Sequence, residues 1–203
     1  MWWWHPRHSA ATIARLEAAF PFELAADVRA ILRVVPESRY SQEMTADDIP
    51  PVVVSGEVLR IPYRVYFPEP SGRSVARLTP RQRLVLAAIF TRNSDGYVRE
   101  RCLREVIRSD EPWVVPFVVQ LLGEYVIEIA SAIDALGGER PAAYAAFVRE
   151  NPSYWTWIRA RMISYWSYYY RRRIRDFSDY PFYQAARTVG AWNGKLPRCR
   201  RRR

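Results

Sequence analysis

Thr79-Pro80-Arg81-Gln82, followed by Leu84-Val85-Leu86 and Ile89-Phe90, is the clearest helix start in this chain of 203 residues. Thr79 and Gln82, three residues apart, form a capping-box pair. Pro80 occupies the first helical position, where its missing N–H group is not needed. Because the apolar residues that follow supply one side of a core, we predict a core helix that runs to the break at 93–96.

Two helices and a hairpin are expected before this segment. Ser9 can cap a first helix, and a second has one apolar face and ends at Pro36. The residues of that face are Leu24, Val28, Ile31, Leu32 and Val35. After a polar loop over 37–51, a valine run at 52–54, a turn at Ser55-Gly56 and an alternation over 59–67 together predict a β-hairpin. Pro62 removes one ladder donor, so the second strand should be an edge strand or be bulged there.

Helices are also expected after the Thr79 segment. A short helix over 98–107 precedes a longer one that Asp110 caps and that reaches about Leu136. The longer helix should be central, because its only polar stripe consists of Gln120, Glu124, Glu128 and Ser131. A helix over 141–149 follows, and Ser153 caps the last long helix.

These elements predict a mainly α fold, an irregular multi-helix domain with one β-hairpin at about 52–67. We expect a single domain over 1–192, in which residues 1–8 form a flexible N-terminus. Residues 193–203 should be a disordered basic tail, since they hold Gly, Pro and an Arg run with almost no apolar content.

One segment resembles a HEAT or armadillo type helical repeat. The resemblance covers about 79–136 and rests on Asp95, Val98, Arg99, Cys102 and Leu103 after a first helix. It implies that an aspartate in the turn and an arginine in the second helix order neighbouring turns. A solenoid needs several stacked repeats, and the Asp-x-x-Val-Arg pattern has no second copy, so an ordinary helical pair is the alternative.

The net charge of +10 lies entirely in the last quarter of the chain. Residues 1–152 hold 18 arginines against 19 carboxylates, net −1, whereas residues 153–203 hold 12 arginines and Lys195 against two aspartates, net +11. This asymmetry predicts an anionic partner for the C-terminal end.

The helix that begins near 153 carries aromatic and basic residues together. Aromatic faces could stack on bases while guanidinium groups neutralise phosphates. The alternative is packing, because six residues spaced three or four apart form one core-facing stripe. That stripe consists of Trp155, Ile158, Met162, Tyr165, Trp166 and Tyr169. The candidate residues for binding an anionic partner are Arg159, Arg161, Arg171, Arg172, Arg173, Arg175, Arg200 and Arg201.

A second candidate is a carboxylate pair, Glu124 and Glu128. At i and i+4 they would share one helix face, and burial could raise a carboxylate pKa to that of a general acid. The alternative is that they form ion pairs with Arg99, Arg104 or the C-terminal arginines. No base, nucleophile or phosphate-binding loop accompanies them, so we assign no catalytic residue.

We also predict no metal site and no cofactor. The two cysteines, Cys102 and Cys199, cannot supply a cysteine zinc site, and His5 and His8 are the only histidines. We expect a cytoplasmic protein, because no secretory signal is visible. The apolar stretch 112–133 holds two carboxylates that each cost about 3 kcal/mol to insert, which favours a buried helix over a transmembrane segment.

The sequence thus predicts a non-enzymatic interaction or adaptor protein whose basic aromatic end binds another protein with an acidic face. Nucleic-acid binding through 153–175 and the tail is the alternative, and an enzyme that uses Glu124 or Glu128 comes third. An edge strand and the indoles of Trp2-Trp3-Trp4 are both compatible with a homodimer. Those three indoles match neither secondary-structure period and could also fill a groove on the same chain.

Overall fold

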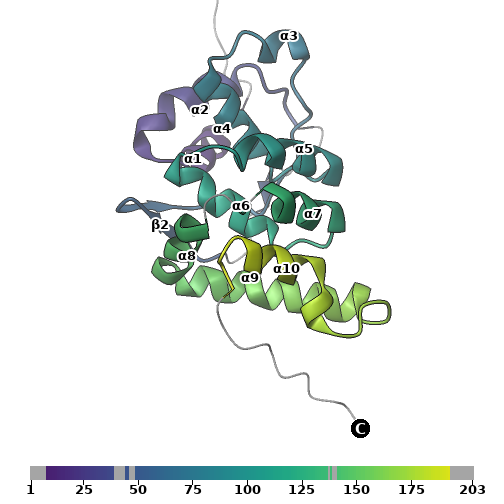
Figure 1. Cartoon of the computed structure of the whole chain (residues 1–203). Coiled ribbons are helices and arrows are strands. Elements are labelled where there is room, and N and C mark those ends of the chain that lie inside the picture. Colours follow the sequence, from purple (N-terminus) through teal and green to yellow (C-terminus); the bar gives the residue numbers. More distant parts are fainter. Residues whose placement is uncertain (1–7, 39–43, 46–48, 137, 139–140, 193–203) are drawn as a thin grey trace, which may run out of the picture.

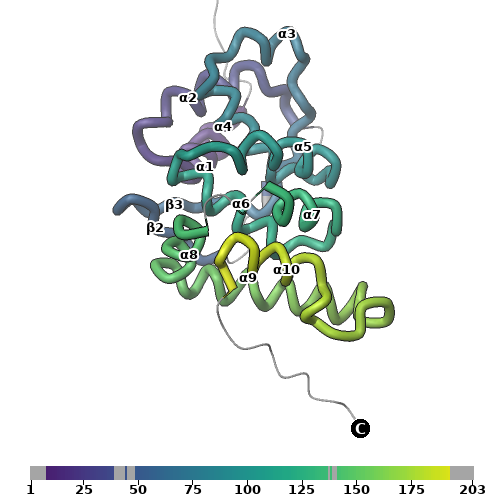
Figure 2. Tube along the Cα trace, viewed as in Figure 1, coloured from purple at the N-terminus to yellow at the C-terminus, as the bar shows by residue number. Residues whose placement is uncertain are grey.

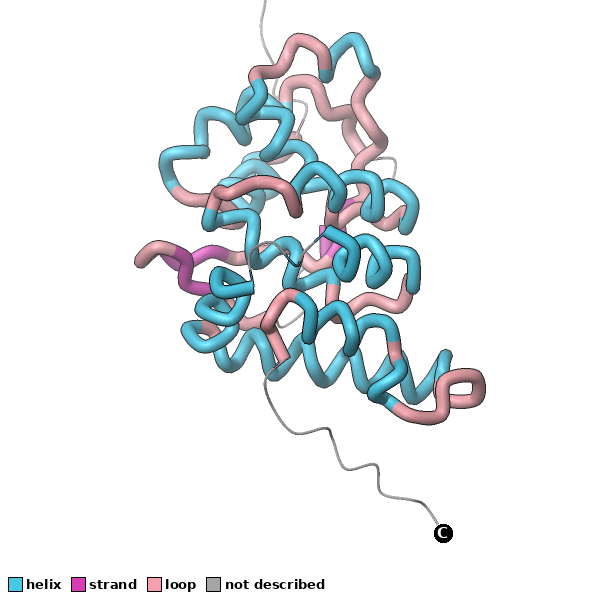
Figure 3. The backbone as a smooth tube through the Cα atoms, in the orientation of Figure 1, coloured by secondary structure: helices cyan, strands magenta, loops and turns pink. Residues whose placement is uncertain are grey.

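The computed structural model describes residues 8–38, 44–45, 49–136, 138 and 141–192. Helices make up most of the described chain, and two short antiparallel strand pairs lie among them (Figures 1 and 3). The predicted mainly α fold with one β-hairpin is therefore confirmed. The predicted tail 193–203 and most of the predicted flexible N-terminus lie outside the described residues.

The N-terminal layer consists of α1 (Ala10–Glu17), the 3-10 turn η1 (Phe22–Leu24) and α2 (Ala25–Leu32). Ser9 caps α1 as predicted, since its hydroxyl accepts a hydrogen bond from the Thr12 N–H at 3.1 Å. All five residues of the predicted apolar face are buried, and α2 packs on α4. His8, predicted to be flexible, is instead buried: its Nε2 lies 3.1 Å from the Val35 carbonyl oxygen.

The predicted helix start at Thr79 is confirmed. Helix α4 (Pro80–Phe90) begins with a capping box, in which the Thr79 hydroxyl accepts from the Gln82 N–H and the Gln82 side chain accepts from the Thr79 N–H. Helix α5 (Gly96–Val106) begins at Asp95, whose carboxylate accepts from the Tyr97 N–H at 2.8 Å. The two helices pack directly on each other.

The predicted hairpin is shorter than expected. Strands β2 (Val52–Val54) and β3 (Glu57–Leu59) pair across the predicted turn, where both Ser55 and Gly56 have positive φ. Two positive φ values are the backbone of a type I′ turn, which matches the twist of the strands. The residues beyond Leu59 do not continue this sheet: β4 (Arg64–Val65) pairs instead with β1 (Met44–Thr45), inside the predicted loop 37–51. Pro62, which has no N–H to donate, lies between β3 and β4.

The predicted long helix over 110–136 is wrong. The structure has a 3-10 turn η2 (Pro112–Val114), helix α6 (Val115–Leu121) and helix α7 (Ile127–Leu136). Turn-like hydrogen bonds from the N–H groups of Gly123 and Glu124 to carbonyls three residues earlier close α6. Pro116 lies in the first turn of α6, where a proline is tolerated. The core position of this region was predicted correctly, because every residue of α6 is buried.

The C-terminal layer runs along one side of the molecule (Figures 1 and 2). Helix α8 (Pro141–Glu150) leads into α9 (Pro152–Tyr165) and the π-helical segment η4 (Trp166–Tyr170). A 3-10 turn η5 (Phe177–Asp179) then precedes α10 (Pro181–Thr188), which returns alongside α9 and packs on α7. The short helix α3 (Gly72–Val75) lies at the opposite end of the molecule.

Asn151, not the predicted Ser153, begins α9. Its side chain joins the hairpin to the α8–α9 junction, because Oδ1 accepts from the Val53 N–H at 2.7 Å and Nδ2 donates to the Val53 and Phe147 carbonyls at 3.0 Å. Pro152 takes the first helical position, so Ser153 already lies inside the helix and is exposed.

We expect Asn151→Ala to lower the free energy of unfolding by about 1–3 kcal/mol, because it leaves part-buried backbone groups of Val53 unsatisfied. Ser153→Ala is the matched control and should change it by less than about 0.5 kcal/mol. Urea unfolding of both variants measures the difference. An equal effect of the two substitutions would contradict the role of Asn151 in joining the hairpin to the α8–α9 junction.

Candidate functional site

Six of the eight predicted anion-binding arginines lie within the described residues, on α9 or just after η4. Arg200 and Arg201 lie outside the described residues. The structure divides the six into two groups. Arg159 and Arg161 are half-buried, whereas four are exposed: Arg171, Arg172, Arg173 and Arg175.

Arg159 and Arg161 pack against aromatic rings. The Arg159 guanidinium lies 4.3 Å from the ring centre of Trp192. Arg161 lies 4.4 Å from the ring centre of Tyr63 and donates to the hydroxyls of Tyr63 and Tyr165, the latter at 2.6 Å. Such cation–π contacts hold these two side chains against the body of the protein, so they are poorly placed to bind a partner.

The exposed arginines lie beside exposed tyrosines. Tyr168 is 81% exposed and Tyr169 is 55% exposed, with their rings edge to face at 4.7 Å. Together with Ser167, Arg171 and Arg172 they line an open hollow at the end of η4. We call these five residues the Tyr-Arg surface. Asp176 is the only acidic residue between 166 and 178, so the surface and the arginines that follow it carry a strong positive charge.

A buried tryptophan anchors the Tyr-Arg surface. Trp166 packs edge to face on Phe177 at 5.3 Å, and its indole N–H donates to the Ile174 carbonyl at 2.9 Å. The hydroxyl of Tyr170 donates to the Tyr125 carbonyl in the α6–α7 turn. These contacts hold η4 and the turn after it against the core and leave the neighbouring side chains in solvent.

The predicted core-facing stripe of α9 is correct as far as Trp166. Ile158, Met162 and Trp166 are buried, and Trp155 and Tyr165 are half-buried, but Tyr169 is exposed. The Arg171 N–H donates to the Trp166 carbonyl, five residues earlier, at 2.8 Å. This π-type bond widens the turn, so the side chains after Trp166 no longer follow the 3.6-residue period.

Glu124 and Glu128 do not form the predicted pair on one helix face. Glu124 lies in the turn between α6 and α7 and is buried, whereas Glu128 lies in the first turn of α7 and is exposed. The prediction depended on one continuous helix, and the break at residues 122–126 removes the i, i+4 relation.

Three arginines surround the Glu124 carboxylate. Arg64 binds it with both terminal nitrogens, at 2.7 Å to Oε1 and 2.5 Å to Oε2. Arg92 Nη2 lies 3.3 Å from Oε1, and Arg99 Nη2 lies 3.6 Å from Oε2. We call these four residues the Glu124 cluster. Its side chains are at most 8% exposed, so it joins β4, the end of α4, α5 and the α6–α7 turn in the protein interior.

Backbone carbonyls accept hydrogen bonds from some of the remaining guanidinium nitrogens. Arg99 Nη1 donates to Asn93 and Ser94 at 2.8 and 2.9 Å, and Arg92 Nε donates to Thr91 at 2.9 Å. Three further nitrogens, Arg92 Nη1 and Arg99 Nε and Nη2, are buried without a hydrogen-bond partner among the described residues. Next to the cluster, Gln120 donates to the Pro62 carbonyl and accepts from the Tyr154 hydroxyl at 3.0 Å.

The electrostatics of the cluster keep Glu124 ionised. Burial by itself would raise the pKa of Glu124, but the three guanidinium groups outweigh it and hold that pKa below its usual range. Burial, opposed by Glu124, lowers the pKa of Arg92 to about 9, so Arg92 still carries its charge at neutral pH. A general acid needs a raised carboxylate pKa, and Glu124 has the opposite shift.

The alternative of an ion-paired carboxylate fits the geometry of Glu124, and Arg99 is one of its partners. Arg104, also considered as a partner, pairs instead with Glu100 at 2.7 Å. Sequence reasoning missed Arg64 and Arg92. Arg64 lies among the polar residues of an alternating pattern and Arg92 follows a helix end, so neither position carries a local signal of burial.

Among the described residues, no group of three or more His, Cys, Asp or Glu side chains could hold a metal ion. No helix within the described ranges is long and apolar enough to cross a membrane. Comparison with protein-family models, with curated proteins and with solved structures finds no match.

We expect Glu124→Gln to destabilise the protein by about 3–5 kcal/mol, since it leaves three buried guanidinium groups without a counter-charge. Glu128→Gln is the control and should change the free energy of unfolding by less than about 0.5 kcal/mol, because Glu128 is exposed. Urea unfolding at pH 7 gives both values. If the two variants were equally stable, the claim that the Glu124 carboxylate stabilises the fold by pairing with the three buried arginines would be wrong.

The contribution of Glu124 to the free energy of unfolding should disappear in acid. Its folded-state pKa is lower than the unfolded value of about 4.3, so the stabilisation is complete above that pH and is lost as the pH falls through the folded pKa. The stability gap between the parent protein and Glu124→Gln should therefore narrow below pH ~4. Urea midpoints measured from pH 7 down to acid test this, and a constant gap would contradict it.

Proposed function

We propose that this protein is a cytoplasmic interaction module that binds an acidic face of another protein through the Tyr-Arg surface. The observation that carries the proposal is the exposure of Tyr168 and Tyr169 beside Arg171 and Arg172. Trp166 holds the segment in place, so binding would not have to order it first. Tyrosine and arginine are enriched among the residues that dominate protein interfaces.

The charge distribution supports an acidic partner. Four exposed arginines follow one another within five positions, and Asp176 is their only acidic neighbour in the sequence. Arginine forms bidentate hydrogen bonds with carboxylates, so a partner rich in aspartate and glutamate fits this surface.

Single-stranded nucleic acid is a second candidate, favoured by the 81% exposure of the Tyr168 side chain. An exposed aromatic face can stack on a base while neighbouring arginines contact phosphates. Only two of the aromatic residues at 154–170 are exposed, and the others are buried or half-buried. The stacking platform is therefore small, which is why this candidate ranks second.

The structure offers matched controls for a binding test. Tyr97 on α5 is also 81% exposed, and Arg104 and Arg108 are exposed arginines in the same region. Tyr168→Ala can thus be compared with Tyr97→Ala, and Arg171→Gln/Arg172→Gln with Arg104→Gln/Arg108→Gln. All variants keep the rest of the chain, including its basic C-terminal run.

We expect the parent protein to bind poly-L-glutamate more tightly than an oligothymidylate, as measured by fluorescence anisotropy over a salt series. Arg171→Gln/Arg172→Gln should weaken binding to poly-L-glutamate by about 1 kcal/mol or more, and its control should not. Equal losses in both arginine pairs would mean unspecific attraction of a polyanion and would overturn the proposal.

The nucleic-acid candidate makes the opposite prediction. The oligothymidylate would then bind more tightly, Tyr168→Ala would cost about 1–3 kcal/mol, and Tyr97→Ala would cost nothing measurable. The slope of log K against log salt would report the number of phosphates contacted.

We do not propose an enzyme that uses Glu124 or Glu128, because Glu124 is buried as an ion pair and Glu128 is separate from it. The homodimer stays a prediction.

A further inference from the structure

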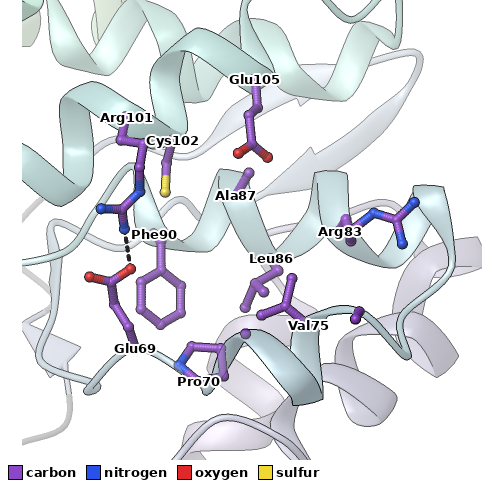
Figure 4. Close-up of a pocket in the computed structure, with 12 residues that line it drawn as sticks. Glu69, Pro70, Val75, Arg83, Leu86, Ala87, Phe90, Arg101, Cys102 and Glu105 are labelled. Carbon is purple, nitrogen blue, oxygen red and sulfur yellow. Dashed lines mark hydrogen bonds and ion pairs between the residues drawn. The ribbon is translucent and has the colours of Figure 1, made fainter.

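A groove of about 520 Å³ lies between α3, α4 and α5, at the end of the molecule far from the Tyr-Arg surface (Figures 1 and 4). Pro70 and Val75 form one wall, and Leu86 and Phe90 of α4 form the base. Its volume is within the range of about 300–1,000 Å³ typical of ligand pockets. The groove is therefore large enough to take bulky side chains.

The lining combines an apolar interior with charged residues at its edge (Figure 4). Glu69 pairs with Arg101, and Arg83 donates to the Leu78 carbonyl at 2.5 Å. Glu105 is exposed, and among the described residues no ion pair or hydrogen bond holds its carboxylate. An occupant with an apolar body and a nearby positive charge would match this lining.

The described chain begins close to this groove. The His8 ring packs edge to face on Phe67 at 5.1 Å, and Glu69, which lines the groove, is only two residues further along. Trp4 precedes His8 by four residues, a span of at most about 14 Å. The side chains of Trp2, Trp3 and Trp4 are therefore within reach of the groove.

We propose that the groove between α3, α4 and α5 is the docking site of Trp2-Trp3-Trp4 of the same chain. The tryptophans would fill the apolar interior, and Arg7 would approach the carboxylate of Glu105. Three successive indoles are costly to leave in water, because each can bury roughly 150–250 Å². This inference is independent of the Tyr-Arg surface and its partner.

The first test uses a fluorescent peptide with the sequence of residues 1–7 and the 203-residue chain carrying Trp2→Ala, Trp3→Ala and Trp4→Ala. The peptide should bind this chain saturably, and it should bind the parent chain more weakly, since the tethered segment competes at high effective concentration. Val75→Glu, added to the triple variant, should weaken binding about tenfold or more by placing a carboxylate in the groove. Val58→Glu is the matched control on the exposed hairpin and should leave binding unchanged.

The second test uses Cys102, which lines the groove. In a Cys199→Ser background it is the only cysteine. Its thiol is buried, and burial raises its pKa to about 12, so alkylation by iodoacetamide is slow. Removing the three tryptophans should accelerate alkylation severalfold, and adding the peptide should reverse this. If circular dichroism shows that the triple variant is unfolded, the single tryptophan variants take its place.

Each outcome decides the proposal. Saturable peptide binding that Val75→Glu weakens, together with faster alkylation, supports it. Binding unaffected by Val75→Glu, or an alkylation rate independent of the tryptophans, overturns it. If protection of Cys102 from alkylation increased with protein concentration, the tryptophans would occupy the groove of a second copy. This result also overturns docking within one chain.

Discussion

The carboxylate of Glu124 is the electrostatic constraint on which the interior depends. It lies among the guanidinium groups of Arg64, Arg92 and Arg99, which come from three different parts of the chain. Burying a charge is costly unless it is paired, so these segments must pack in an arrangement that brings the three guanidinium groups to the Glu124 carboxylate. The short β4 strand, the end of α4, α5 and the α6–α7 turn are thereby placed relative to one another.

The same constraint explains why helix ends and turns, and not continuous helices, lie beside the Glu124 cluster. One carboxylate cannot satisfy three guanidinium groups, and backbone carbonyls at 91–94 accept several of the remaining N–H donors. Those carbonyls are available because α4 ends at Phe90 and the chain turns before α5. The break between α6 and α7 brings Glu124 into the cluster. The loop backbone at 91–94 therefore helps to hold the side chains of the Glu124 cluster in place.

The aromatic residues of the C-terminal layer serve two different purposes. Most of them pack against other side chains of the protein: Trp166 against Phe177, Tyr154 against Phe147, and Trp192 against the Arg159 guanidinium. Tyr168, which lies outside the predicted stripe, faces solvent, and so does Tyr169, because the π-type turn after Trp166 moves it off the packed side. The surface that we propose for a partner and the groove between α3, α4 and α5 lie at opposite ends of the molecule, so each can be altered by substitution without touching the other (Figure 1).

Local chemistry in the sequence determined the fold class and several element boundaries. The capping box at Thr79, the cap at Ser9 and the turn at Ser55-Gly56 depend on neighbouring residues, and all three were predicted correctly. The apolar periods of α2 and of α9 as far as Trp166 also placed the right side chains in the core. The exposed arginines after η4 could be named from the charge of the last quarter, although which of them face solvent could not.

Only the tertiary structure decided the rest, because it depends on residues far apart in the sequence. Arg64 and Glu124 are 60 positions apart, and although an ion pair of Glu124 was one of two alternatives, nothing local names Arg64 as its partner. The same holds for Asn151, the residue at the N-cap of α9, whose side chain bonds to a strand 98 positions away. Periodicity reports which face of an element is apolar, whereas the partner of a buried polar group is set by how the whole chain packs.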